Sequence, residues 1–164
     1  MTAAELVSLT PVLILALGAT VILMAGAWFP DRRRALVLSG VVAAILSSLS
    51  ALILTPHVQE AGGLFGTGPY ARFFGVVWSL AAALTLLFSL RRTERAPFAA
   101  GEYASLILFA AAGMSLLSSA TSLVGLFLGL ETFTLAFYIL IAFDKSNDQG
   151  AEAGLKYLIL GAKA

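Results

Sequence analysis

The chain has 164 residues, of which 60% are hydrophobic and 12% are charged, and its formal net charge is +1. Soluble domains hold roughly 45–50% apolar and about 25% charged residues, so this composition predicts a membrane protein, and the small net charge gives no reason to expect nucleic acid as a partner. With no cysteine and one histidine, disulfides and thiolate sites are excluded, and a histidine metal cluster is not expected.

Five apolar runs are each long enough to cross a hydrocarbon core of roughly 30 Å. They occupy residues 6–29, 34–55, 71–90, 103–120 and 122–143. Each run ends at a helix-terminating signal, namely Pro30-Asp31, Pro56, Arg91-Arg92, the turn Ser119-Ala120-Thr121 and Asp144. The sequence therefore predicts an all-α integral membrane protein with five transmembrane helices, forming a single domain over residues 1–164.

A sixth helix is predicted to begin near Gly150, in the stretch AEAGLKYLILGA. It reaches Ala164 after about fifteen residues, which at 1.5 Å per residue is too short to cross a bilayer comfortably. The first run is not expected to be a cleaved signal peptide. Its start carries Glu5 and no Lys or Arg, and PDRRR follows it like a stop-transfer signal.

Basic residues gather in alternate loops of the predicted topology. The loops after the first, third and fifth runs hold Arg32, Arg33, Arg34, Arg91, Arg92, Arg95 and Lys145, whereas the other loops offer only Arg72. By the positive-inside rule these basic loops are cytoplasmic, and the N-terminus lies outside. His57, in the longest outside loop, is interpreted as an exposed loop histidine.

The stretch LFLGLETFTLAFYIL, residues 126–140, places Glu131 near the middle of the fifth run. The carboxyl group would lie about 15 Å from both interfaces. A charged carboxylate facing lipid there costs on the order of 2.5–3.5 kcal/mol. An acid at this depth therefore predicts a protein-facing or hydrated surface.

Helical periodicity divides the fifth run into two faces. Thr134 and Tyr138 share the Glu131 face, and their hydroxyl groups could bond the carboxyl group or hold water beside it. Gly125, Gly129 and Ala136 fall on nearly the opposite side. Their small side chains predict close packing against another helix.

Two interpretations of Glu131 remain open. A permanently neutral acid would act only as a hydrogen-bonding contact between helices. Alternatively, burial favours the neutral acid and a nearby cation favours the carboxylate, so a movable cation would make the group a proton relay. The candidate cation is Lys156, a possible relay that is also placed to pair with Glu152 four residues earlier or to reach the cytoplasmic interface.

Serine and threonine residues in the other runs are expected to bond within or between helices. Ser115 alone is singled out as possible pathway lining. No metal-ligand, nucleophile–base or cofactor motif is present, so no cofactor is predicted in this chain. The residues concerned are Ser47, Ser48, Ser50, Ser79, Thr85, Ser115, Ser118 and Ser119.

The stretch VGLFLGLETFTLAFYILIAF, followed by a polar loop and AEAGLKYLILGA, resembles subunit N of bacterial NADH-quinone oxidoreductase, respiratory complex I. That family comprises antiporter-like, proton-pumping membrane subunits. The resemblance is sharpest over residues 122–162 and covers about the N-terminal third of a family member. It implies that Glu131 pairs with a lysine on a later helix, and that Lys156 has a secondary part in the proton path.

The resemblance further implies a bacterial inner-membrane location and other membrane-arm subunits as partners, with quinone met only through the complex. Electron transfer would occur in other subunits, so this chain would hold no redox centre. The missing later helices predict a truncated frame, a split subunit or an incomplete chain. The alternatives are a subunit of a cation/proton antiporter or membrane-bound hydrogenase complex, a non-transporting structural subunit, and a stand-alone transporter, for which the chain lacks helices.

Overall fold

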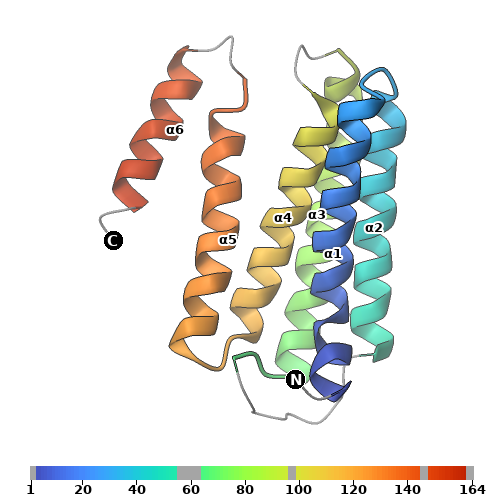
Figure 1. Ribbon diagram of the computed structural model, residues 1–164, viewed down its shortest axis with the longest axis vertical. Coiled ribbons are helices and arrows are strands. Elements are labelled where there is room, and N and C mark those ends of the chain that lie inside the picture. The colour runs from blue at the N-terminus through green and yellow to red at the C-terminus, as the bar shows by residue number, and fades with distance from the viewer. Residues whose placement is uncertain (1–2, 55–63, 96–98, 145–147, 162–164) are drawn as a thin grey trace.

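The computed structural model describes residues 3–54, 64–95, 99–144 and 148–161. These residues form six α-helices and no strand (Figure 1). The helices are α1 (Ala3–Trp28), α2 (Arg33–Leu54), α3 (Pro69–Arg95), α4 (Ala100–Ser119), α5 (Leu123–Ile141) and α6 (Asp148–Gly161). His57 and Lys145 lie outside the described residues.

Five of these helices are long and apolar enough to cross a membrane, which confirms the predicted fold class. The main difference from the sequence prediction lies in α3, which begins at Pro69 and continues through Arg91 and Arg92 to Arg95. Arginine favours a helical backbone, so the basic pair ends the apolar span without ending the helix. The apolar span itself ends at Arg91.

Helix α4 is the centre of the molecule. It contacts α1, α2, α3 and α5, whereas α5 contacts α4 and α6 and no other described helix. Alanine and glycine dominate the buried positions of α4, so neighbouring backbones approach it closely. Gly101 of α4 lies against Gly26 of α1, where a methyl group would come within 2.8 Å of the facing Cα atom.

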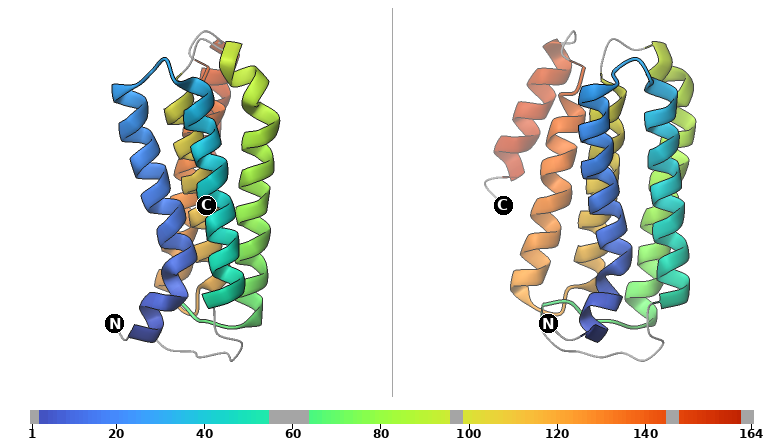
Figure 2. Two further views of the ribbon diagram at one scale, coloured as in Figure 1. Left: turned by 90° about the vertical axis from the view of Figure 1, so that its right-hand side faces the viewer. Right: turned by 45° about the vertical axis from the view of Figure 1, so that its right-hand side comes forward.

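The core of the first four helices combines these small residues with a few large side chains. Leu15, Val37, Leu86 and Leu108, one from each helix, are fully buried. Figure 2 shows α5 and α6 to one side of this four-helix bundle. We call α5 and α6 the peripheral hairpin.

Loops alternate between the two ends of the molecule. The turn at Pro30 and the ends of α3 and α5 lie at one end, at the top of Figure 1, while the start of α1, the end of α2 and the turn between α4 and α5 lie at the other. Arg32, Arg33 and Arg34 therefore share an end with Arg91. This is the distribution on which the predicted orientation depends.

Candidate functional site

A reciprocal glycine contact fixes how α5 sits on α4. A methyl group at Gly113 of α4 would lie 2.5 Å from the main-chain nitrogen of Phe133, and one at Gly129 of α5 would lie 2.5 Å from that of Leu117. The backbone that lies against each glycine thus belongs to the residue four positions after the glycine of the other helix. The contact leaves no room for a side chain at either position.

The remaining small residues of α5 complete this packed face. Gly129, Gly125 and Ala136 are the buried residues of α5, as the sequence predicted. Gly125 lies directly against the Leu64 carbonyl oxygen, which belongs to the connection between α2 and α3. Ser122 caps the helix by accepting a hydrogen bond of 3.0 Å from the Gly125 amide.

Glu131 is the ninth of the nineteen residues of α5. It therefore lies about 12 Å from the first residue of the helix and about 15 Å from the last, near the middle of the candidate span. The side chain is half-buried. Within the described residues no hydrogen bond or ion pair of its carboxyl group is found. The chain has thus placed an acid at mid-span without supplying its partner from this part of the protein.

Glu131 lies on the stripe of α5 against which α6 packs. Tyr138 and Ala142 follow Glu131 by seven and eleven residues and so share its side of the helix. Gly154 of α6 meets Ala142, and Gly161 meets the Tyr138 hydroxyl group. The α6 contact therefore runs along the Glu131 stripe.

The register of the two antiparallel helices stops this contact short of Glu131. Each residue farther along α6 lies opposite a residue earlier on α5, so the level of Glu131 corresponds to a position about eleven residues beyond Gly154. That position lies past Gly161, the last described residue of α6. Figure 1 shows α6 ending beside the middle of α5.

The Thr134 hydroxyl group, on the Glu131 face, bonds to the main chain of its own helix. Thr134 donates to the main-chain carbonyl oxygens of Leu130, at 2.8 Å, and of Glu131, at 3.2 Å. The Tyr138 ring stands edge-to-face on Tyr157 of α6, with centroids 5.0 Å apart. Thr134 therefore does not donate to the Glu131 carboxyl group, as the sequence allowed, because its hydroxyl group already donates to carbonyl oxygens of its own helix.

Lys156 is not brought to Glu131. Its Nζ lies 2.5 Å from Oε1 of Glu152, and the two side chains are 69% and 63% exposed, which confirms that the spacing suits this local pair. Lys156 lies two residues beyond Gly154, near the level of Leu140, about 13 Å along the axis from Glu131. Strong coupling would require a separation of roughly 4–6 Å.

A second polar cluster joins three helices of the bundle. The Ser47 hydroxyl donates to the Pro11 carbonyl oxygen at 2.8 Å, and it lies 3.0 Å from the Ser79 hydroxyl, which donates to the Gly75 carbonyl oxygen at 2.8 Å. Both serine side chains are fully buried. The sequence expectation of packing serines is confirmed here, but the crossing to α1 was not foreseen, because it depends on which helix faces Ser47.

The described residues contain no group of three or more acidic or histidine side chains that could hold a metal ion. What the arrangement offers chemically is one mid-span carboxyl group on a helix face that α6 covers only in part.

The comparisons with known proteins agree with this architecture. The family model described as NADH:quinone oxidoreductase/Mrp antiporter, TM, matches residues 120–164. NADH-quinone oxidoreductase subunit N from Geotalea uraniireducens is 45% identical over 164 residues, covering 99% of this chain and 34% of that protein. The subunit N of Syntrophotalea carbinolica is 44% identical, covering 95% and 32% respectively.

Among solved structures, a chain of respiratory complex I from Thermus thermophilus with bound aureothin matches with a TM-score of 0.74 and 26% identity, over 93% of this chain and 33% of that chain. The chain is therefore homologous to the antiporter-like membrane subunits of NADH-quinone oxidoreductases. Within that class its relatives are subunit N, which confirms the resemblance seen in the sequence. The chain spans about a third of the length of the curated relatives it matches.

Proposed function

We propose that this chain forms part of a proton-translocating membrane subunit of NADH-quinone oxidoreductase, with Glu131 as a proton relay. The observation that carries the proposal is the position of Glu131. Its carboxyl group lies at mid-span, on the α6-facing stripe, with no ionic partner among the described residues. An acid at that depth costs free energy, so its presence there points to a functional role.

The relay requires a cation that is supplied from outside the described residues. A lysine brought next to Glu131 would favour the carboxylate, and its departure or neutralisation would favour the protonated acid. Alternation between these two states lets one group take up a proton and release it later. Lys156, about two and a half turns nearer the α5–α6 connection, has the secondary role of receiving or delivering protons at that end.

The chemistry of electron transfer is assigned to other subunits. In this proposal the chain acts as a membrane-arm component of the complex, as part of a subunit like the subunit N relatives that it matches. Its partners would be the other membrane-arm subunits and lipid, with quinone met only through the complex. The bacterial relatives support a location in the bacterial inner membrane.

The relay is tested by Glu131→Gln in the assembled enzyme, because glutamine keeps the size and hydrogen bonding of glutamate but cannot titrate. Proton translocation driven by NADH is expected to fall by about 100-fold or more, the lower end of what a proton-transfer group contributes, while the amount of assembled complex is unchanged. Glu102→Gln is the matched control, because that glutamate is exposed in the first turn of α4. Undiminished translocation in Glu131→Gln would leave only the structural role.

The proposed orientation is tested with single cysteines, because the native chain has none. Cysteine replacing Asp31 is expected to react with a membrane-impermeant maleimide from the cytoplasmic side, and cysteine replacing Thr121 from the opposite side. The two positions lie at opposite ends of the bundle, so each is the control for the other. The reverse pattern would overturn the N-terminus-outside assignment.

A further inference from the structure

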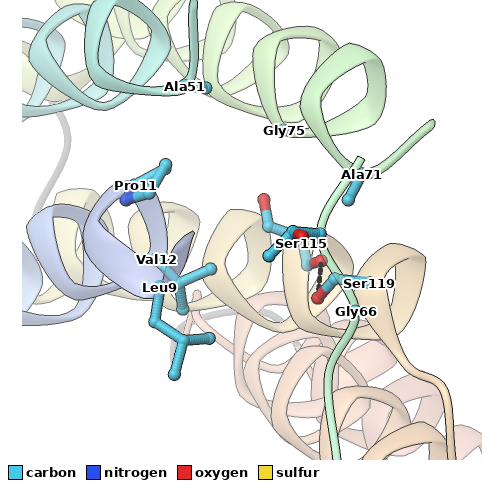
Figure 3. A pocket seen from close by; sticks show the side chains of 10 residues that line it. Leu9, Pro11, Val12, Ala51, Gly66, Ala71, Gly75, Ser115 and Ser119 are labelled. Carbon is cyan, nitrogen blue, oxygen red and sulfur yellow. Dashed lines mark hydrogen bonds between the residues drawn. The ribbon is translucent and has the colours of Figure 1, made fainter. Parts of the chain in front are cut away.

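A small cavity lies at the end of the bundle where the N-terminal part of α1 meets the ends of α2 and α4 and the start of α3 (Figure 3). Its volume is about 30 Å³. A cavity of about 10–15 Å³ is large enough for one water molecule, and a cavity binds water only when polar groups line it. The size therefore suits one or two water molecules, and the lining decides whether they bind.

One lining group demands a partner. Ser115 of α4 is 6% exposed, and its Oγ is a buried side-chain atom that has no hydrogen-bond partner within the described residues. Most other serines of α4 donate to their own helix, as Ser105 does to the Glu102 carbonyl oxygen at 2.8 Å and Ser119 to that of Ser115 at 3.1 Å. An orphaned hydroxyl group beside a water-sized space is unusual, because leaving it unpaired is costly.

The rest of the lining is polar enough to hold water. Ser119 brings a second hydroxyl group from α4. The lining also includes Pro11 and Gly75, the two residues whose carbonyl oxygens accept from the buried pair Ser47 and Ser79. The cavity thus adjoins both ends of the hydrogen-bonded cluster that joins α1, α2 and α3.

We propose that this cavity is a buried water site, in which water bonds Ser115 Oγ and links α4 to the polar cluster of the other three helices. A bound water gives Ser115 the partner that it lacks among protein groups. It also extends a three-helix junction into a four-helix one. The site is separate from Glu131, and the inference does not depend on the proposed proton relay.

The first test is Ser115→Ala in the full chain, followed by thermal unfolding in detergent. If the cavity is dry, removing an unsatisfied hydroxyl group should raise the unfolding midpoint; if water is bound, its anchor is lost and the midpoint should fall by about 2–4 °C. Ser105→Ala is the matched control, since it makes the same exchange on the same helix at a hydroxyl group that already has a partner. A rise in the unfolding midpoint of Ser115→Ala, or a fall no larger than that of Ser105→Ala, overturns the proposal.

The second test uses Gly75→Ala, which fills the cavity. Among the described residues, a methyl group at buried Gly75 would meet only the Ala51 side chain, at 3.7 Å, and both residues line the cavity. With water bound, the methyl group displaces it and costs stability when Ser115 is present, but not in the Ser115→Ala background. A dry cavity predicts instead that the two substitutions are additive and that Gly75→Ala is stabilising in both backgrounds. Additivity would therefore refute the water site even if Ser115→Ala alone were misleading.

Discussion

The four-helix bundle and the peripheral hairpin are built differently from similarly apolar sequences. Residues buried inside the protein make up 61% of the apolar window of α4 and 17% of that of α5. In the bundle every helix contacts at least two others, whereas α4 is the one described helix of the bundle that α5 contacts. Hydrophobicity therefore identifies the spans, and small residues at matched positions decide which of them form a core.

Polar groups differ between the two regions in the same way. The buried hydroxyl groups of Ser47 and Ser79 meet partners on neighbouring helices, so the bundle satisfies them itself. The carboxyl group of Glu131, in the hairpin, has no such partner in the described part of the chain. The bundle can thus serve as a scaffold, while the hairpin carries the residue whose chemistry depends on further neighbours.

The largest effect is expected from Gly113→Ala, which disturbs the helix–helix interface between α4 of the bundle and α5 of the hairpin. The new methyl group would lie 2.5 Å from the backbone nitrogen of Phe133, and a backbone cannot move aside as a flexible side chain can. We expect a loss of about 1–3 kcal/mol. Hydrogen exchange measured by mass spectrometry should show faster exchange in α5 peptides and unchanged protection in α2 peptides.

Leu128→Ala is the control for this variant, because Leu128 is an exposed residue of α5. It should leave the exchange of α5 close to that of the native chain. Equal acceleration in α2 and α5 of Gly113→Ala would show that bundle and hairpin unfold as one unit. The distinction between them would then be wrong.

A smaller effect is expected from Ser47→Ala, which removes the bond from α2 to the Pro11 carbonyl oxygen of α1 and the contact with Ser79. Hydrogen bonds between membrane helices contribute about 0.6 kcal/mol on average and up to about 1.7. The free energy of unfolding should fall within that range. Ser50→Ala removes a hydrogen bond to its own helix and should lower the free energy of unfolding by less. An equal loss in the two variants would show that the cluster does not stabilise the contact between helices.

The smallest effect is expected from Glu152→Gln, which breaks the exposed pair with Lys156. Exposed pairs four residues apart on a helix contribute about 0.3–0.5 kcal/mol. The unfolding free energy should therefore change by less than about 0.5 kcal/mol. A loss above about 1 kcal/mol would mean that the hairpin is held by this ion pair as well as by its contact with α4.

Much of this organisation could be predicted from the sequence, because it depends on local periodicity. The five spans follow from apolar run length, and the packed face of α5 follows from the spacing of Gly125, Gly129 and Ala136. Pairing between helices could not be predicted in this way. The close contact between Gly113 and the backbone of Phe133 depends on which helices become neighbours and in what register.

The surroundings of Glu131 show the same limit at the level of one side chain. Periodicity correctly places Thr134 on its side of α5, but a threonine hydroxyl can always reach a carbonyl oxygen of the preceding turn, and here it does. The sequence also indicated Lys156 as a candidate cation. The register of α6 against α5 instead keeps that lysine about 13 Å along the axis from Glu131.

The central claim, that Glu131 changes its protonation state during turnover, is tested most directly by infrared difference spectroscopy of the assembled enzyme. Native complex and Glu131→Gln complex would be compared before and during NADH oxidation, so that the difference between them isolates this carboxyl group. The account predicts a carboxylic-acid carbonyl band that appears or disappears in the native enzyme during turnover and is absent from Glu131→Gln. Identical difference spectra for the two complexes would contradict it.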